Sequence, residues 1–372
     1  MLSILDMSIV EVSLTTPSLR KKPSLHQTLL CLSKRSPVFH DKISREDLSR
    51  IILHIQGCRG KYFKTVPSAG ATYPIEVYIA SSGNIFPLPK GLYRYISCKG
   101  KLVQVADEGV TEDYLLIAAV YERTIRVYGP RGYMYVREEV GHLLQNLALS
   151  LVSHGLYYEY TLEPSLKVPK GKPEAKVKVY RADRICSEEL EGMSLDEIIV
   201  RRRSIRSFQK RPLSLRKIID VLKWSLQESP NKYFTVFGSK ACSISLYVVV
   251  ANVEGLEEGI YYFNTDRGSL ELVKRGSFSR KLYESALMQD CVLKAPANIV
   301  IAGSRNELVD YIAGAVGQNI YLNSTAQGLG TVAVGAFYDE EVADVLGTDM
   351  KPLYIMPIGV PIVSLERVKY RV

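Results

Sequence analysis

The chain has 372 residues, of which 47% are hydrophobic and 23% are charged. This composition is typical of globular proteins and excludes a disordered chain, and the length allows two or three domains. Lys and Arg outnumber Asp and Glu by 48 to 39, which gives a net charge of +9. A basic balance favours an anionic partner, such as nucleic acid, a phosphorylated cofactor or an acidic substrate.

The sequence lacks the usual marks of membrane, secreted and metal-binding proteins. No apolar run approaches the roughly 18 residues of a membrane helix, and the N-terminal segment, with Asp6 and Glu11, has no basic secretory region. Six cysteines without C-x-x-C spacing predict reduced thiols rather than disulfides or a zinc site. The five histidines share no metal-ligand spacing. We therefore expect a cytoplasmic protein that contacts no membrane and binds no metal.

In chain order, the first half opens with amphipathic helices. The helix that starts at Ser44 carries apolar residues on one face, namely Leu48, Ile51, Ile52 and Ile55. Strands are predicted at 76–80, 91–95, 114–120 and 175–180, with a long helix around Gln145-Asn146 before the last of them.

The second half repeats this pattern at a nearly constant offset. The matched elements are Arg35-Ser36 with Arg203-Ser204 (offset 168), Ser44 with Ser214 (170), Gly91–Tyr95 with Gly259–Phe263 (168), and Gly141 and Gln145-Asn146 with Gly314 and Gln318-Asn319 (173). Four matches in the same order predict two homologous domains, 1–185 and 186–372. Each is expected to have an α+β fold, with a mixed β-sheet flanked by helices, and the two are expected to pack together.

Basic residues are densest in the run Arg201-Arg202-Arg203-Ser204-Ile205-Arg206-Ser207-Phe208, at the end of a predicted helix. Guanidinium groups beside a serine hydroxyl suit phosphate oxygens, because guanidinium offers paired planar donors. A solvated basic face or a nucleic-acid patch explains the same run equally well.

This run resembles the opening motif of the nitroreductase family, flavin enzymes of α+β fold. Further stretches resemble its SagB-type dehydrogenase branch in the same order: Pro67-Ser68-Ala69-Gly70, Tyr128-Gly129-Pro130-Arg131-Gly132-Tyr133, Glu139-x-Gly141-His142 and Gln145-Asn146. In the second half, Val334-Gly335-Ala336-Phe337 resembles the loop whose backbone faces the flavin ring. The resemblance covers nearly the whole chain and implies an FMN-dependent oxidoreductase with NAD(P)H as the electron donor.

In the family that this chain resembles, FMN lies between two subunits. One subunit supplies the arginine motif, the ring-facing loop and a C-terminal cation, and the other supplies the Pro-Ser loop. Here the first half keeps Pro67-Ser68-Ala69-Gly70 but has Lys34–Phe39 in place of the arginine motif, whereas the second half keeps the arginine motif but has Val236–Ser239 in place of the Pro-Ser loop. These complementary losses predict one FMN per chain, bound at a single composite site in an intramolecular pseudo-dimer.

The resemblance also implies roles for individual residues. The candidate cofactor-binding residues are Pro67, Ser68, Ala69, Gly70, Arg202, Arg203, Ser204, Arg206, Gln289, Val334, Gly335, Arg367 and Lys369. The arginine motif and one of the C-terminal cations would hold the ribityl-phosphate, and backbone N–H groups near Gly335 would bond flavin N5. Tyr128 is the candidate catalytic residue, with a structural tyrosine as the alternative. In azoline-oxidising members a lysine precedes this tyrosine, and Val127 stands there instead.

Three functions remain open at this point. The first is an FMN-dependent oxidoreductase acting on a small-molecule or peptide substrate. The second is a flavin-binding but catalytically idle subunit of a peptide-modifying complex. The third is a nucleic-acid-binding protein using the basic stretch 201–217, which we do not expect because no helix-turn-helix, zinc or RNA-binding signature accompanies it.

Overall fold

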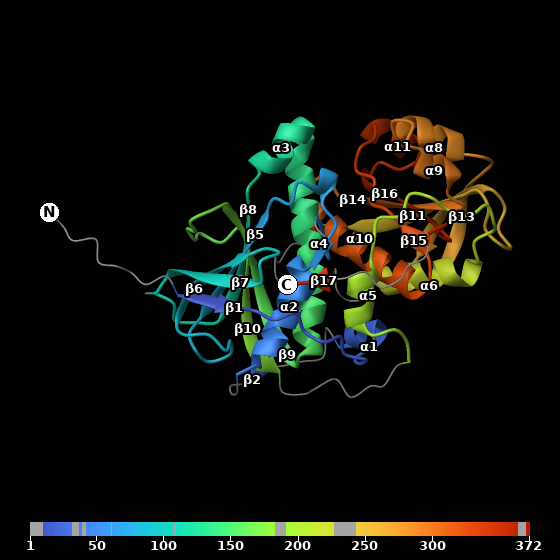
Figure 1. Ribbon diagram of the computed structural model, residues 1–372. Coiled ribbons are helices and arrows are strands. Elements are labelled where there is room, and N and C mark those ends of the chain that lie inside the picture. Colours follow the sequence, from blue (N-terminus) through green and yellow to red (C-terminus); the bar gives the residue numbers. More distant parts are fainter. Residues whose placement is uncertain are drawn as a thin grey trace.

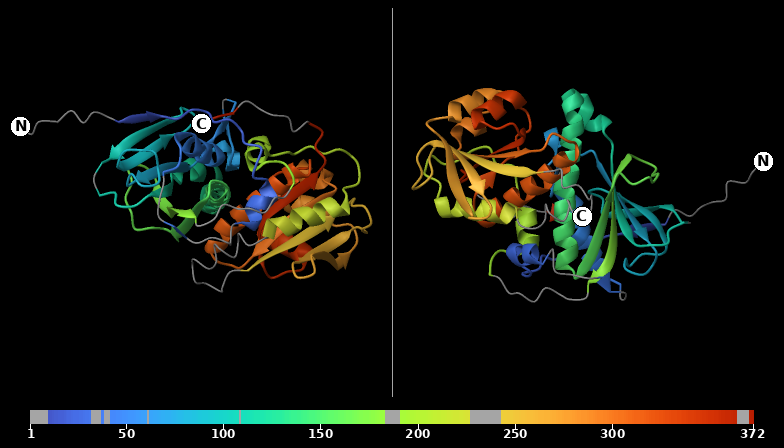
Figure 2. Two further views of the ribbon diagram at one scale, coloured as in Figure 1. Left: turned by 90° about the horizontal axis from the view of Figure 1, so that it is seen from below. Right: turned by 180° about the vertical axis from the view of Figure 1, so that it is seen from behind.

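Two halves, each a β-sheet with helices, meet along a pair of long helices (Figure 1). The computed structural model describes residues 10–31, 37–38, 42–60, 62–107, 109–182, 191–226, 243–363 and 370–372. The two sheets lie on opposite sides of the long helix pair, α4 (Gly132–Ser153) and α10 (Leu308–Ala326), in all three views (Figures 1 and 2).

The first half contains the elements β1 (Glu11–Ser13), α1 (Leu25–Leu30), β2 (Pro37–Val38), α2 (Arg45–Gln56), β3 (Cys58–Arg59), β4 (Phe63–Lys64), the 3-10 turn η1 (Ala69–Ala71), β5 (Ile75–Ser81), β6 (Gly91–Ile96), β7 (Lys101–Ala106), β8 (Tyr114–Ala119), α3 (Glu122–Tyr128), the 3-10 turn η2 (Gly129–Arg131), α4, β9 (Leu156–Leu162) and β10 (Lys172–Ala182). Its sheet has the order β1-β7-β6-β5-β8-β10-β2, with β9 paired to β10. Helix α2 begins after the predicted Ser44, whose hydroxyl accepts a hydrogen bond from the Asp47 amide. Its predicted apolar face is fully buried, and burial stabilises the fold by about 1.5–3 kcal/mol for each such side chain.

The second half contains α5 (Leu195–Arg201), α6 (Leu215–Leu226), β11 (Ile244–Val250), β12 (Gly259–Asn264), β13 (Ser269–Arg275), α8 (Ser279–Ser285), α9 (Asp290–Lys294), β14 (Ala297–Gly303), α10, β15 (Gly330–Thr331), α11 (Asp339–Leu346), β16 (Lys351–Gly359) and β17 (Tyr370–Arg371). Its sheet has the order β13-β12-β11-β14-β16-β15. The strands predicted from alternating apolar residues therefore occupy the sheet centres in both halves.

The predicted α+β fold is confirmed, but the strand pairing differs from the predicted mixed sheet. All strand pairs in the two sheets are antiparallel. Parallel contacts occur as the isolated bridges Ser204–Thr331 and Leu213–Val253. Connectivity accounts for part of this: β6 and β7, and likewise β12 and β13, are joined by short hairpin turns, which place consecutive strands antiparallel.

Helices α4 and α10 cross at two glycines, at the places where the sequence repeat matched them. A Cβ atom on Gly141 would lie 1.9 Å from the Tyr311 carbonyl oxygen, and one on Gly314 would lie 2.0 Å from the Glu138 carbonyl oxygen. Any larger residue would force the helices apart, so glycine at both positions lets the two backbones touch.

One turn beyond this crossing, the side-chain amides bond reciprocally. Gln145 Nε2 donates to Asn319 Oδ1 at 2.8 Å, and Gln318 Nε2 donates to Asn146 Oδ1 at 2.7 Å. All four residues are completely buried, where an unpaired amide would be costly. The contact is the same on both sides, as in an isologous dimer interface.

The helices that open the two halves also cross over. In α1, the His26 ring stacks on Trp224 of α6 with centroids 4.1 Å apart, whereas α5 contributes to the core of the first half. Ser24 and Ser194, which cap these two helices, pair in an antiparallel bridge. At the other end of the chain, Tyr370 of β17 pairs with Arg59 of β3. The first half therefore includes α5 and β17 of the second half, whereas α1 stays in the core of the first half and only contacts α6.

The prediction of reduced thiols is wrong for three of the described cysteines. Cys58 in β3 and Cys98 in the turn between β6 and β7 form a disulfide, with Cα atoms 5.5 Å apart. Cys31 is also disulfide-bonded, and Cys291 is a buried free thiol. The pairing escapes sequence reasoning because the sheet brings together residues 40 positions apart.

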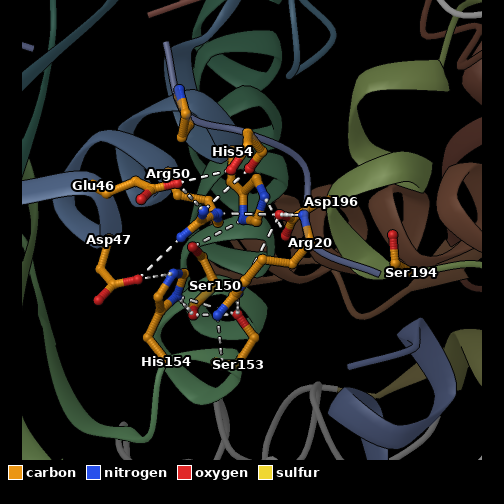
Figure 3. A network of polar contacts seen from close by, with 12 residues as sticks. Arg20, Glu46, Asp47, Arg50, His54, Ser150, Ser153, His154, Ser194 and Asp196 are labelled. Atoms are coloured by element: carbon orange, nitrogen blue, oxygen red, sulfur yellow. Dashed lines mark hydrogen bonds and ion pairs between the residues drawn. The ribbon is translucent and has the colours of Figure 1, made fainter. Parts of the chain in front are cut away.

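A buried polar network ties α5 to the first half (Figure 3). Asp196 Oδ2 accepts a hydrogen bond from the Arg20 amide at 2.8 Å and lies 3.1 Å from Arg50 Nε. Asp196 Oδ1 lies 3.2 Å from His54 Nε2. Burial raises the pKa of Asp196, but His54 and Arg20 outweigh burial and hold it well below its usual range. The charged aspartate thus fixes α5, whose last residues lead into the arginine motif.

No helix in the described part of the chain is long and apolar enough to cross a membrane.

Candidate functional site

A cavity lies between the two halves, bordered by Pro67–Gly70 on one side and by Val332–Ala336 on the other. It holds about 730 Å³ of atom-free space, part of it open to solvent. Ten of the predicted site residues line it, namely Pro67, Ser68, Ala69, Gly70, Tyr128, Ser204, Arg206, Gln289, Val334 and Gly335.

The Pro-Ser loop has a strained backbone. Gly70, Ala71 and Tyr73 have φ angles of 55°, 54° and 46°, and for residues other than glycine this conformation costs on the order of 1–3 kcal/mol. Two hydrogen bonds hold the loop in this shape: the Tyr73 amide donates to Ser68 Oγ at 2.9 Å, and Arg123 Nη1 donates to the Tyr73 carbonyl at 2.7 Å. The loop is therefore fixed before any ligand arrives.

Two tyrosines close the cavity against glycines of both halves. A Cβ on Gly70 would lie 2.4 Å from the Tyr128 hydroxyl oxygen, and one on Gly335 would lie 2.7 Å from Tyr135 Cε1. The two rings meet edge to face with centroids 5.1 Å apart. Burial raises the pKa of Tyr135 to about 12, so that hydroxyl stays protonated at neutral pH.

The ring-facing loop is held by side chains from both halves. Gln289 Nε2 donates to the Ala336 carbonyl at 2.8 Å. Arg131 crosses from the first half, where its Nε donates to the Gly335 carbonyl at 2.8 Å and its Nη2 to Asp339 at 2.7 Å. Sequence reasoning quoted Arg131 within a motif but gave it no role, because nothing in the sequence shows that it reaches the other half.

One arginine of the motif, Arg202, points inward. The Arg202 side chain is buried, and it donates to the Thr65 carbonyl at 3.0 Å and to the Lys64 carbonyl at 3.2 Å. Its guanidinium lies 5.0 Å from the ring centroid of Tyr321, and Tyr321 lines the cavity and bonds Ser204 Oγ at 3.0 Å. Arg202 thus lies directly behind the cavity wall. Arg202 is therefore not part of an exposed basic surface, whereas Arg206, Lys210 and Arg211 of the same basic stretch are exposed.

Besides Arg202, three of the predicted site residues are not among those that line the cavity. Arg203 does not line the cavity. Arg367 and Lys369 lie outside the described residues.

Two buried titratable side chains in the cavity wall had no assigned role in the sequence analysis. Burial raises the pKa of Glu139 to about 8, although its hydrogen bond with Ser68 and the Lys64 charge lower it. Burial lowers the pKa of His142 to about 3, and its Nδ1 lies 3.0 Å from Gln318 Oε1. At neutral pH both groups are therefore uncharged. The motif Glu139-x-Gly141-His142 was the signal available for them.

Ser150, His54 and Asp196 lie in hydrogen-bonding order, as in serine hydrolases (Figure 3). All three are at most 2% exposed, and none lines the cavity. A nucleophile without access to substrate cannot act, so this group is structural.

Comparisons with known proteins agree with this architecture. The nitroreductase family model matches residues 199–360. The chain is 33% identical to a nitroreductase-family protein of Methanocaldococcus jannaschii over 184 residues, which are 46% of this chain and 93% of the relative. Among solved structures, a nitroreductase-like protein from Anabaena variabilis covers 85% of this chain and 88% of its own, at 20% identity and a TM-score of 0.69. A second, from Ralstonia eutropha, covers 47% of this chain and 87% of its own, at 22% identity and a TM-score of 0.38.

The fold and the sequence relationship together define an oxidoreductase class. The chain belongs to the nitroreductase family, whose members generally bind flavin and use NAD(P)H. The Anabaena structure shows that the same fold extends over both halves of the chain.

Proposed function

We propose that this protein is an FMN-dependent oxidoreductase that binds one flavin per chain between its two halves. The observation that carries the proposal is the interdomain cavity, which collects the Pro-Ser loop of the first half and the arginine motif and ring-facing loop of the second. Family membership supports the class of chemistry. The SagB-type branch and an NAD(P)H donor are part of the proposal and rest on the sequence motifs.

The residues present fit FMN, a flat ring joined to a phosphate. At one end, the buried Arg202 Nη1 has no hydrogen-bond partner, which leaves a donor for an anion. At the other end, Gly70 and Gly335 keep side chains out of the cavity. When bound, the flavin supplies hydride transfer at its N5 atom.

In this proposal each half has a distinct task. Arg202, Ser204 and Arg206 hold the phosphate, with Arg203 as a fourth candidate. Pro67–Gly70 and Val334–Gly335 position the two faces of the ring and exclude water. We assign the C-terminal cation to Arg367 or Lys369.

Glu139 and Tyr128 are the cavity's candidate proton carriers. Glu139 holds its proton at neutral pH because burial raises its pKa to about 8. Tyr128 lines the cavity beside Gly70, and its hydroxyl can donate to a substrate. The nature of that substrate, small molecule or peptide, is left to activity measurements.

We further propose that the two halves, 1–185 and 186–372, arose by tandem duplication. The supporting observations are the reciprocal contacts: Gly141 with Gly314 at the helix crossing and Ser24 with Ser194 at the helix caps. Because α5 and β17 pack on the first half, neither half is expected to fold alone.

The proposal is tested by flavin content. The purified protein should be yellow, hold one FMN per chain and be bleached by NADH or NADPH without oxygen. Arg206→Ala should lower flavin retention at least tenfold, whereas Arg35→Ala, in the stretch of the first half that stands in place of the arginine motif, should retain the wild-type amount. A protein that stays colourless after incubation with FMN and gel filtration would refute the function. Equal loss in both variants would refute the single composite site.

Turnover separates the oxidoreductase from the catalytically idle alternative. An active enzyme should oxidise NAD(P)H steadily with quinone or nitroaromatic acceptors. Stoichiometric flavin without turnover on any of these acceptors would favour the idle subunit of a peptide-modifying complex.

A further inference from the structure

Two buried arginines, one from each half, converge on one carbonyl oxygen. Arg59 of β3 and Arg202 of the arginine motif both donate to the Lys64 carbonyl, at 3.4 Å and 3.2 Å. Arg59 Nη1 also donates to the main-chain carbonyl of Arg202. The two side chains are 7% and 2% exposed. Like charges are therefore held together away from water.

No acid neutralises this pair among the described residues. Neither Arg59 nor Arg202 forms an ion pair with a carboxylate in that part of the chain, and Arg59 Nε and Arg202 Nη1 lack hydrogen-bond partners. Burial, followed by the Arg202 and Arg203 charges, lowers the pKa of Arg59 to about 9. Buried charge without a partner is strongly unfavourable, so the cluster calls for an anion supplied from outside the protein.

The cluster's position adjoins the proposed cofactor cavity. The Arg202 guanidinium lies against Tyr321, and Tyr321 lines the cavity and bonds Ser204. The β3 strand that carries Arg59 is fixed on one side by β17 and by the disulfide at its first residue, Cys58. Arg59 is thus held in place from the first half, facing the motif of the second.

We infer that Arg59 is a phosphate-binding residue, which together with Arg202 holds the dianionic phosphate of the cofactor from the opposite half of the chain. A dianion matches two guanidinium forks better than a single carboxylate, because each fork offers paired planar donors. The inference rests on the proposed flavin site and changes it: the first half grips the phosphate as well as the ring. Arg59 belongs to none of the motifs that the sequence analysis quoted.

The test compares FMN with riboflavin, which has the same ring but no phosphate. Dissociation constants are measured by flavin fluorescence quenching for the wild type, Arg59→Gln, Arg59→Lys and the control Arg94→Gln, whose arginine pairs with Glu76 away from the cluster. Arg59→Gln should weaken FMN binding at least tenfold and change riboflavin binding less than twofold. Arg59→Lys should fall between Gln and the wild type, and the control should match the wild type.

Other outcomes would contradict either the role of Arg59 or the proposed flavin function, and the two can be told apart. Equal weakening of FMN and riboflavin by Arg59→Gln would mean that Arg59 only maintains the fold, and no weakening would mean that it does not face the phosphate. A wild-type protein that binds neither flavin refutes the proposed function. In that case inorganic phosphate still tests Arg59: it should raise the melting temperature of the wild type and not that of Arg59→Gln, and equal shifts in both would refute the role. If Arg59→Gln does not fold, Arg59→Lys decides by the ratio of its two flavin affinities.

Discussion

Two buried arginines of the first half, Arg50 and Arg59, face the second half in opposite electrostatic settings. Arg50 is 3% exposed and Arg59 is 7% exposed. Arg50 pairs with Asp196 at 3.1 Å and with Asp47 at 3.0 Å (Figure 3). Arg59 instead donates to main-chain carbonyl groups and lies beside Arg202.

The difference separates a structural contact from a binding contact. The buried Arg50 has its charge neutralised by Asp196, and this pair holds α5 against α2 in the folded protein. The buried Arg59 lies beside another cation, Arg202, and their charges are neutralised only when a ligand brings negative charge. The boundary between the halves therefore contains two kinds of region. The Arg50 region stabilises the fold by itself, whereas the Arg59–Arg202 cluster destabilises the fold until an anion binds.

Replacing Asp196, the acid that neutralises Arg50, should have the largest effect on stability. Asp196→Asn leaves Arg20 and Arg50 without their shared carboxylate in a buried setting. Breaking a buried pair in this way costs about 3–5 kcal/mol. Urea unfolding should show this loss, and flavin affinity should fall as well because α5 leads into the arginine motif.

Glu46→Gln provides the control for Asp196→Asn. Glu46 also contacts Arg50, at 2.8 Å, but its side chain is 52% exposed, so its removal should cost less than about 1 kcal/mol. If both variants lose the same small amount, the network does not hold the halves together, and the contrast with Arg59 disappears.

The cation cluster depends on a different restraint, the Cys58–Cys98 disulfide next to Arg59. A cross-link over 40 residues stabilises a fold by about 2–4 kcal/mol. The Cys58→Ser, Cys98→Ser double variant should lose this amount in urea unfolding. It should also bind FMN less tightly while riboflavin binding changes little, because β3 carries the proposed phosphate contact.

Cys291→Ser is the matched control for the disulfide variant, because Cys291 is a buried free thiol and makes no cross-link. It should lose less stability than the double variant, because no cross-link is removed. A double variant as stable as Cys291→Ser would show that the cross-link does not constrain the chain.

Local patterns in the sequence predicted much of the fold and most of the cavity wall. Alternating apolar residues place β5 and β8, and the cap at Ser44 places α2, because these signals act within a few residues. Ten cavity residues followed from motifs whose spacing is short. The resemblance predicted that these motifs meet, and Pro67–Gly70 and Arg206, from different halves, do line one cavity.

What the sequence could not predict depends on contacts between distant segments. Arg131 reaches Gly335 only because α4 and α10 cross at two glycines, and Arg59 reaches Arg202 only because β3 lies at the boundary. Cys58 and Cys98 pair only after β6 and β7 form. In each case the partner is set by how the halves pack, which no local pattern encodes.

The smallest predicted effect is on how stability depends on pH. His154 in the Arg50 network and Glu139 in the cavity wall should change it in opposite directions. Burial, followed by the Arg20 charge, lowers the pKa of His154 in the Arg50 network to about 3. The unfolded chain, with a histidine pKa near 6.5, binds a proton that the folded protein excludes. Stability from this group is therefore lost as pH falls from about 6.5 towards 3.

Glu139 in the cavity wall makes stability change with pH in the opposite direction. Burial raises its pKa to about 8, whereas the unfolded chain loses this proton near pH 4.5, so stability falls as pH rises from about 4.5 to 8. Urea unfolding between pH 6 and 8 should lose at least about 1 kcal/mol in the wild type, and Glu139→Gln should flatten this slope. His154→Asn should flatten only the slope below pH 6.5. A Glu139→Gln variant that keeps the wild-type slope above pH 6 would mean that Glu139 is charged in the folded protein, and the cavity wall would then carry a negative charge facing the flavin ring.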